Sequence, residues 1–104
     1  MDKYEAQIEI SHILQDHILD FAKSYMNLTA CRLILKAFDD PMTKTSINQA
    51  VNSEFNSIVR KASKCKDKML QADYNDTIDL LKQLKNDVYE SIINTLKQDT
   101  GVLI

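Results

Sequence analysis

The fold is decided by residues 2–41, which read DKYEAQIEISHILQDHILDFAKSYMNLTACRLILKAFDDP. Between Asp2 and Phe38 there is no Gly and no Pro, the two residues least compatible with a helix interior. Apolar residues recur there at every seventh position, at Leu14, Phe21, Leu28 and Leu35. This spacing predicts a first helix over residues 2–38, and a break near Asn27 would divide it in two and give four helices in all.

The motif Asp39-Asp40-Pro41 predicts the end of the first helix and the start of a second. An Asp before a Pro suits an N-cap followed by Pro at the first helical position. The predicted second helix covers residues 41–72, with apolar residues at steps of three and four: Ile47, Val51, Phe55, Ile58, Ala62, Cys65, Met69 and Ala72. Such spacing is typical of a helix that packs along another helix.

A third helix is predicted over residues 75–98, with Asp73 or Asn75 as its N-cap and Gly101 as a C-terminal cap residue. Its apolar row is Ile78, Leu81, Leu84, Val88, Ile92 and Leu96. The whole chain has one Gly and one Pro, too few for the turns of a strand-rich fold. Short connections make neighbouring helices antiparallel. The sequence therefore predicts an all-α, up-down-up bundle, a single domain over residues 1–104 with a short apolar tail at 99–104.

Composition excludes several classes of protein. Thirteen basic and fifteen acidic residues give a net charge of -2, which argues against a nucleic-acid-binding protein. No apolar run approaches the roughly 20 residues that cross a bilayer, so no membrane span is expected. The first residues lack the pattern of a secretory signal, and two cysteines, Cys31 and Cys65, are too few for a disulfide framework. We therefore expect reduced thiols and a cytoplasmic protein.

No motif of a catalytic, cofactor or metal site is present. Glu9-Ile10-Ser11-His12 matches the Glu-x-x-His step of di-iron bundles, but that chemistry needs a second such step and two more carboxylates. The only other histidine, His17, lies within an apolar stripe and is expected in a core or an interface. We expect no enzyme activity, no cofactor, no metal and no small-molecule substrate.

The first helix is apolar over an unusually wide arc. Its main stripe is Ile10, Leu14, His17, Phe21, Leu28 and Leu35. A second group lies a quarter to half a turn away, at Tyr4, Ile8, Leu19, Ala22, Met26, Leu33 and Ala37. Either this is the central helix of the bundle, covered on both sides, or its surplus apolar surface faces another chain.

The second interpretation predicts a small non-enzymatic protein–protein interaction module, an adaptor or a regulatory subunit. It would bury the surplus face of its first helix in a homodimer or against a helical partner. The predicted contact residues are Ile8, Leu19, Met26, Leu33 and Phe38.

An alternative function rests on a basic stripe of the second helix: Arg60, Lys61, Lys64 and Lys68. These cations would allow a small inhibitor or immunity-type regulator to dock an acidic macromolecular target. They would also match carboxylates of the first helix at a similar height, including Glu9, Asp16 and Asp20, which explains the stripe without a target.

Overall fold

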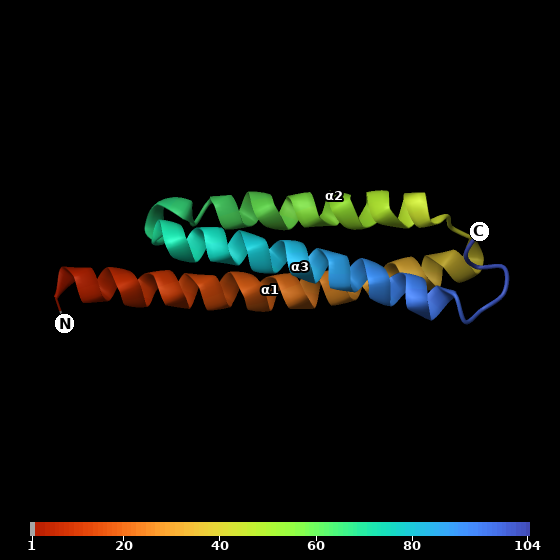
Figure 1. Ribbon diagram of the computed structural model, residues 1–104, viewed down its shortest axis with the longest axis horizontal. Coiled ribbons are helices and arrows are strands. Elements are labelled where there is room, and N and C mark those ends of the chain that lie inside the picture. Colours follow the sequence, from red (N-terminus) through yellow and green to blue (C-terminus); the bar gives the residue numbers. More distant parts are fainter. Residues whose placement is uncertain (1) are drawn as a thin grey trace.

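A computed structural model describes residues 2–104 as a rod of three α-helices, about 60 Å long and 17 Å in its other two dimensions (Figure 1). The helices are α1 (Lys3–Asp39), α2 (Lys44–Ser63) and α3 (Gln71–Leu96), with a short 3-10 helix, η1 (Lys66–Lys68), before α3. They run up, down and up, so α1 and α3 are parallel and also form the most extensive helix contact. The predicted all-α bundle of three helices is confirmed.

The first helix is unbroken, which excludes the four-helix alternative. Asp2 caps its start by accepting a hydrogen bond from the Glu5 amide at 2.8 Å. Within the stretch where a break was considered, Thr29 is buried and its hydroxyl donates to the Tyr25 carbonyl at 3.1 Å. Because that hydroxyl is satisfied inside the helix, Thr29 does not compete with the backbone. The first turns of α1 extend beyond the connection between α2 and α3 (Figure 1).

The predicted start of the second helix at Pro41 is wrong by three residues. Thr43 is the N-cap of α2, and it forms a reciprocal capping box with Ser46. Asp40 is extended, as expected for a residue before Pro. Met42 is held extended by the C-terminal tail, because its amide donates to the Val102 carbonyl and its carbonyl accepts from the Ile104 amide.

The second helix also ends at Ser63, well before the predicted residue 72. Four of the next five residues, Lys64 to Lys68, are charged, so this segment offers little apolar surface to extend the helix along the bundle. The chain turns here instead, and Met69 is buried at the end of the core. Cys65 and Met69 therefore lie outside α2, and Ala72 is exposed in the first turn of α3.

The start of α3 is capped by a residue of α1. Neither Asp73 nor Asn75 is the N-cap; this position belongs to Leu70, which has no side-chain capping group. Its amide donates to the Ser11 hydroxyl at 2.9 Å, and that hydroxyl donates to the Asp73 carboxylate at 2.6 Å. Ser11, which is fully buried, thus accepts from the amide of the N-cap residue, as the N3 side chain does in a capping box.

A second polar contact continues this link between α1 and α3. The Gln15 amide group lies within hydrogen-bond distance of the Asp73 carbonyl, the Asp76 carboxylate and the Thr77 hydroxyl. Within residues 2–104, no buried side-chain nitrogen or oxygen lacks a partner. These side chains fix where α3 begins relative to α1.

The predicted apolar rows of the second and third helices are largely confirmed as core. Ile47, Val51, Phe55, Ile58 and Ala62 of α2 are buried, as are Leu81, Val88, Ile92 and Leu96 of α3. The main stripe predicted for the first helix does not form the core, since Leu28 and Leu35 are exposed. The buried residues of α1 instead form an inner face, made of Ser11, Ile18, Ala22, Met26, Thr29, Leu33 and Ala37. Four of these seven are small, so α1 can approach its neighbours closely.

The C-terminal tail folds back on the connection between α1 and α2. Helix α3 ends at Leu96, two residues before the predicted end, and Gly101 adopts a positive φ of 90° in the turn that follows. This left-handed conformation favours glycine. Val102 is buried, and Leu103 forms a single parallel bridge with Met42. Ile104 remains exposed.

Candidate functional site

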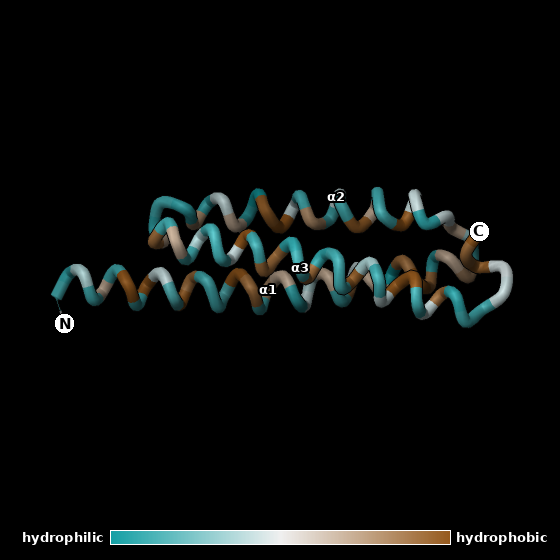
Figure 2. Tube along the Cα trace, in the orientation of Figure 1, coloured by the Kyte–Doolittle hydropathy of each residue, from teal (hydrophilic) through white to brown (hydrophobic). Residues whose placement is uncertain are grey.

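A second apolar row runs along α1, largely on the side away from the core, although Leu14 and Phe21 also pack against the core. We call it the outer seam, and it consists of Ile10, Leu14, His17, Phe21, Ser24, Leu28, Cys31, Leu35 and Phe38. Leu28 and Leu35 are 71% and 68% exposed, and Phe38 and Ile10 are about half exposed. Figure 2 shows hydrophobic segments recurring along the whole of α1, including the turns that extend beyond the rest of the bundle. Leu14 and Phe21 are half-buried. The rest of the outer seam is an apolar surface that this chain leaves uncovered.

The spacing of the outer seam is that of a helix-pairing surface. Successive members are four and three residues apart in strict alternation from Ile10 to Phe38. This is the heptad pattern by which one helix packs its side chains between those of another. No member carries a fixed charge, and only His17 and Ser24 are polar. The surface suits an apolar helix far better than a charged or extended partner.

The outer seam is comparable in size to the largest apolar patch of a typical monomer. It spans 28 residues, or about 42 Å at 1.5 Å per residue. With a helix diameter of about 10–12 Å, it covers roughly 400–500 Å², which lies within the range of the largest apolar patch on a typical monomer. Patches of this size are often sites of interaction.

A polar contact borders the outer seam on the side of α2. The Tyr25 hydroxyl donates to the Glu54 carboxylate, and the Arg32 guanidinium lies 3.0 Å from the other oxygen of that group. The hydrogen bond from Tyr25 lowers the pKa of Glu54; burial opposes this shift, and Arg32 reinforces it. The same hydrogen bond raises the pKa of Tyr25. These groups join α1 to α2 and leave the outer seam uncovered.

The basic stripe lies beside the outer seam at the other end of α2. Arg60, Lys61, Lys64 and Lys68 are all exposed. A groove of about 330 Å³ between α1 and α2 has an apolar floor, including Phe21 and Ile58, and is bordered by Lys61 and Lys64. The Lys61 ammonium lies 4.3 Å from the centre of the Phe21 ring. The basic stripe and the outer seam therefore meet at Phe21.

The expected pairing of this basic stripe with carboxylates of α1 is wrong. Across residues 2–104 there are two ion pairs, Arg32 with Glu54 and His12 with Asp73, and neither involves the stripe. Arg60 instead donates to the Ser57 hydroxyl. Glu9, Asp16 and Asp20 are exposed, and none of them forms an ion pair within residues 2–104.

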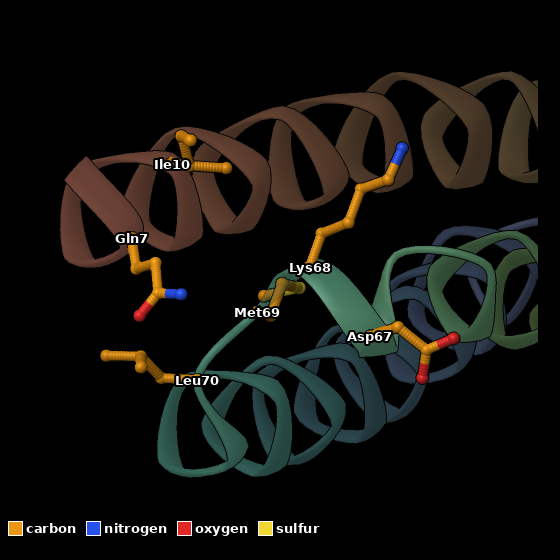
Figure 3. A pocket seen from close by; sticks show the side chains of 6 residues that line it. All are labelled: Gln7, Ile10, Asp67, Lys68, Met69 and Leu70. Atoms are coloured by element: carbon orange, nitrogen blue, oxygen red, sulfur yellow. The ribbon is translucent and has the colours of Figure 1, made fainter. Parts of the chain in front are cut away.

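A second groove lies where the free end of α1 passes the turn before α3. It has a volume of about 380 Å³ and includes Gln7 and Ile10 from α1 and residues 67–70 from the turn (Figure 3). In this view Gln7 extends from α1 toward Leu70, and Lys68 rises beside α1. Ile10 thus belongs both to this groove and to the outer seam.

The structure separates the five predicted contact residues. Phe38 is exposed and belongs to the outer seam, whereas Ile8 and Leu19 are half-buried. The expectation that Met26 and Leu33 lie on an uncovered face is wrong, because both are buried in the inner face of α1. They are covered by this chain itself.

The sequence pattern places Ile10, Leu28 and Leu35 in the main stripe of the first helix, outside the predicted contact residues, and Ile13, which is 59% exposed, belongs to neither group. The signal that could have found them is side-chain size. The face with Ala22 and Ala37 lets long helices approach closely, whereas a row of Leu and Phe packs at a larger distance between helix axes. The small-residue face was therefore the better candidate for the core.

No family model, curated protein or solved structure matches this chain. Among residues 2–104, no three His, Cys, Asp or Glu side chains gather closely enough to hold a metal ion. No helix in the described part of the chain is long and apolar enough to cross a membrane. The outer seam is the surface on which a function can be argued.

Proposed function

We propose that this chain is a non-enzymatic protein–protein interaction module, an adaptor or regulatory subunit, that buries the outer seam of α1 against another helix. The observation that carries this proposal is the exposure of Ile10, Leu28, Leu35 and Phe38 at heptad spacing. A helical partner would remove this apolar surface from water, and such burial stabilises a complex by about 25 cal/mol per Å² before the costs of association. A groove-binding small molecule would leave most of the row exposed.

The test compares the unsubstituted chain with Leu28→Asp. An aspartate in the middle of the outer seam should abolish assembly, because its charge would be buried without a partner. Helical content should be unchanged, since Leu28 is 71% exposed. The readouts are absolute mass by light scattering at several concentrations, circular dichroism, and capture of proteins by the immobilised chain.

The matched control is Ile104→Asp, which places the same charge on an exposed apolar residue outside the outer seam. This variant should assemble as the unsubstituted chain does. Assembly that survives Leu28→Asp would overturn the proposal. The proposal would also be overturned if the unsubstituted chain stays monomeric and captures the same proteins as the Leu28→Asp variant.

A second candidate function is docking of an acidic macromolecule by the basic stripe, as an inhibitor or immunity-type regulator would do. The favouring observation is that Arg60, Lys61, Lys64 and Lys68 form no ion pair within residues 2–104. Charge reversal at Lys64 and Lys68 distinguishes the two candidates. It should abolish binding to an acidic target and leave assembly through the outer seam intact.

A further inference from the structure

We propose that the outer seam of α1 pairs with the same surface of a second copy of this chain, with the two α1 helices antiparallel. In this arrangement Leu14 lies level with the partner's Cys31, and Leu35 lies level with the partner's Ile10. The inference rests on the proposed function and names the partner. Three features of the outer seam support it: side-chain size, flanking residues and position relative to the bundle.

The first feature is the division of the outer seam into two rows of different size. One row is uniformly large: Leu14, Phe21, Leu28 and Leu35. The other has small or polar residues at its centre: Ile10, His17, Ser24, Cys31 and Phe38. When two such helices are antiparallel, each of the four residues of the large row packs against a residue of the partner's other row, and Phe38 lies beyond the last of these pairs. Each large side chain then meets a smaller one at the centre, which fills the layers evenly.

A parallel pair would instead place each row against itself. Phe21 would meet the partner's Phe21, whereas Ser24 would meet the partner's Ser24 one layer away. His17 would also lie against the partner's His17, two polar rings within an apolar layer. Alternating crowded and underfilled layers pack poorly, since both excess and missing volume destabilise a close-packed interface.

The second feature is the flanking row, which selects one register of the antiparallel pair. Its members are Ile13, Asp20, Asn27 and Ile34. With Leu14 level with the partner's Cys31, Ile13 lies beside the partner's Ile34, and Asp20 lies beside the partner's Asn27. Apolar residues thus meet apolar residues, and a carboxylate meets an amide that can donate to it.

The neighbouring registers lack this match. A shift of one heptad in one direction places Asp20 beside the partner's Ile34. The opposite shift places Asp20 beside the partner's Asp20, where two like charges repel. The flanking row therefore specifies the register with Leu14 opposite the partner's Cys31.

The third feature is the position of the outer seam relative to the bundle. At about 100° per residue, its centre lies about 150° around α1 from the centre of the inner face. Most of the outer seam therefore faces away from α2 and α3, and α2 borders it at Phe21, where the Lys61 ammonium lies over the ring. A contact of roughly 400–500 Å² from the outer seam is about half of the roughly 800 Å² per partner of a stable interface, so the flanking row must contribute the remainder.

The experiment uses chains with one cysteine each, in a Cys31→Ser, Cys65→Ser background. One chain carries Ile10→Cys and the other carries Leu35→Cys, both at exposed positions, so that neither change disturbs the core. The chains are oxidised with diamide separately and as a mixture, and analysed on a non-reducing gel. Diamide accepts the two electrons and two protons released when two thiols form a disulfide.

The proposed dimer predicts a disulfide between unlike chains in the mixture. The cross-linked fraction should be at least roughly tenfold higher than for either chain alone, because like positions lie too far apart to be bridged. Cross-linking of each chain alone would indicate a parallel pair and overturn the inference. A Leu28→Asp change added to both chains is the control, and it should abolish the cross-link.

Failure of this inference differs from failure of the proposed function. A dimer that is lost with Leu28→Asp but gives no cross-link in the mixture overturns the antiparallel register and leaves the interaction module intact. A monomer at all concentrations overturns the second copy as partner, and capture of another protein by the outer seam then decides the proposed function. A dimer that is insensitive to Leu28→Asp overturns both.

Discussion

The two faces of α1 are both apolar, but they differ in the size of their side chains and in what covers them. The inner face combines Ala22, Ala37, Ser11 and Thr29 with a few large residues, and it is buried. The outer seam carries Leu28, Leu35 and Phe38, and these are exposed. Long parallel helices approach one another closely only where side chains are small. Apolar character alone therefore does not identify the core of a long helix.

The largest expected difference between the two faces is in stability. Met26→Ala should lower the free energy of unfolding by about 3 kcal/mol, because a buried methionine is replaced and a cavity remains. Leu28→Ala should change it by less than about 0.5 kcal/mol, because Leu28 is on the exposed face. Urea unfolding below the concentration of any self-association measures both. Equal losses in the free energy of unfolding would contradict this expectation, because they would place Leu28 in the core of the single chain.

A smaller difference is expected for serine, which occurs on both faces. Ser11→Ala should destabilise the fold by about 1–2 kcal/mol, because the Leu70 amide loses its acceptor and the Asp73 carboxylate loses one of its donors. Ser24→Ala is the matched control on the outer seam, with an expected change within about 0.5 kcal/mol. Thermal and urea unfolding of the two variants measure the contrast. A neutral Ser11→Ala would mean that the helix start is fixed by packing and not by this cap.

The helices also differ in how well their buried faces can be predicted from the sequence. The apolar rows of α2 and α3 were predictable, since each helix has a single apolar stripe that must face the bundle. The choice between two stripes of α1 was not, because periodicity contains no information on which stripe finds a partner. The cap of α3 by Ser11 joins residues 59 positions apart, so no local pattern indicates it.

The sequence predicts an interaction surface on α1, and the structure changes which residues of α1 are exposed to form one. The excess apolar arc of α1 led to the expectation of an interaction surface, and Phe38 was identified correctly as exposed. The prediction that Met26 and Leu33 face a partner is wrong because the core forms on their stripe and not on the main stripe with its larger side chains. The prediction that the second helix starts at Pro41 is wrong because Met42 pairs with the C-terminal tail. No local pattern indicates this pairing, since the tail lies 60 positions away in the sequence.

A still smaller effect is expected where the two faces meet, at Tyr25 and Glu54. Because the pKa of Glu54 is lowered in the folded chain, the pair stabilises the fold at pH values above the ordinary carboxyl pKa of 4.5. This contribution is lost as the pH falls through the lowered pKa. The raised pKa of Tyr25 means that its contribution is present below pH 10.0 and is lost as the pH rises through that raised pKa.

Urea midpoints at pH 7 and pH 3 test this expectation in the unsubstituted chain and in Glu54→Gln. The unsubstituted chain should lose more stability on acidification, since the variant has no carboxylate at this position to protonate. An equal loss in both chains would show that the contact between Tyr25 and Glu54 contributes no pH dependence. The apolar row of α2 would then be the contact that holds α2 to α1.

The smallest effect is expected for Lys64→Glu combined with Lys68→Glu, at the end of the basic stripe. Both side chains are exposed and neither forms an ion pair within residues 2–104, so stability should change by less than about 0.5 kcal/mol. Helical content and the mass of any assembly should also be unchanged, because these lysines lie outside the outer seam. Light scattering and circular dichroism measure both. Loss of assembly in this variant, with Leu28→Asp still assembling, would transfer the interaction from the apolar face of α1 to the cations beside it.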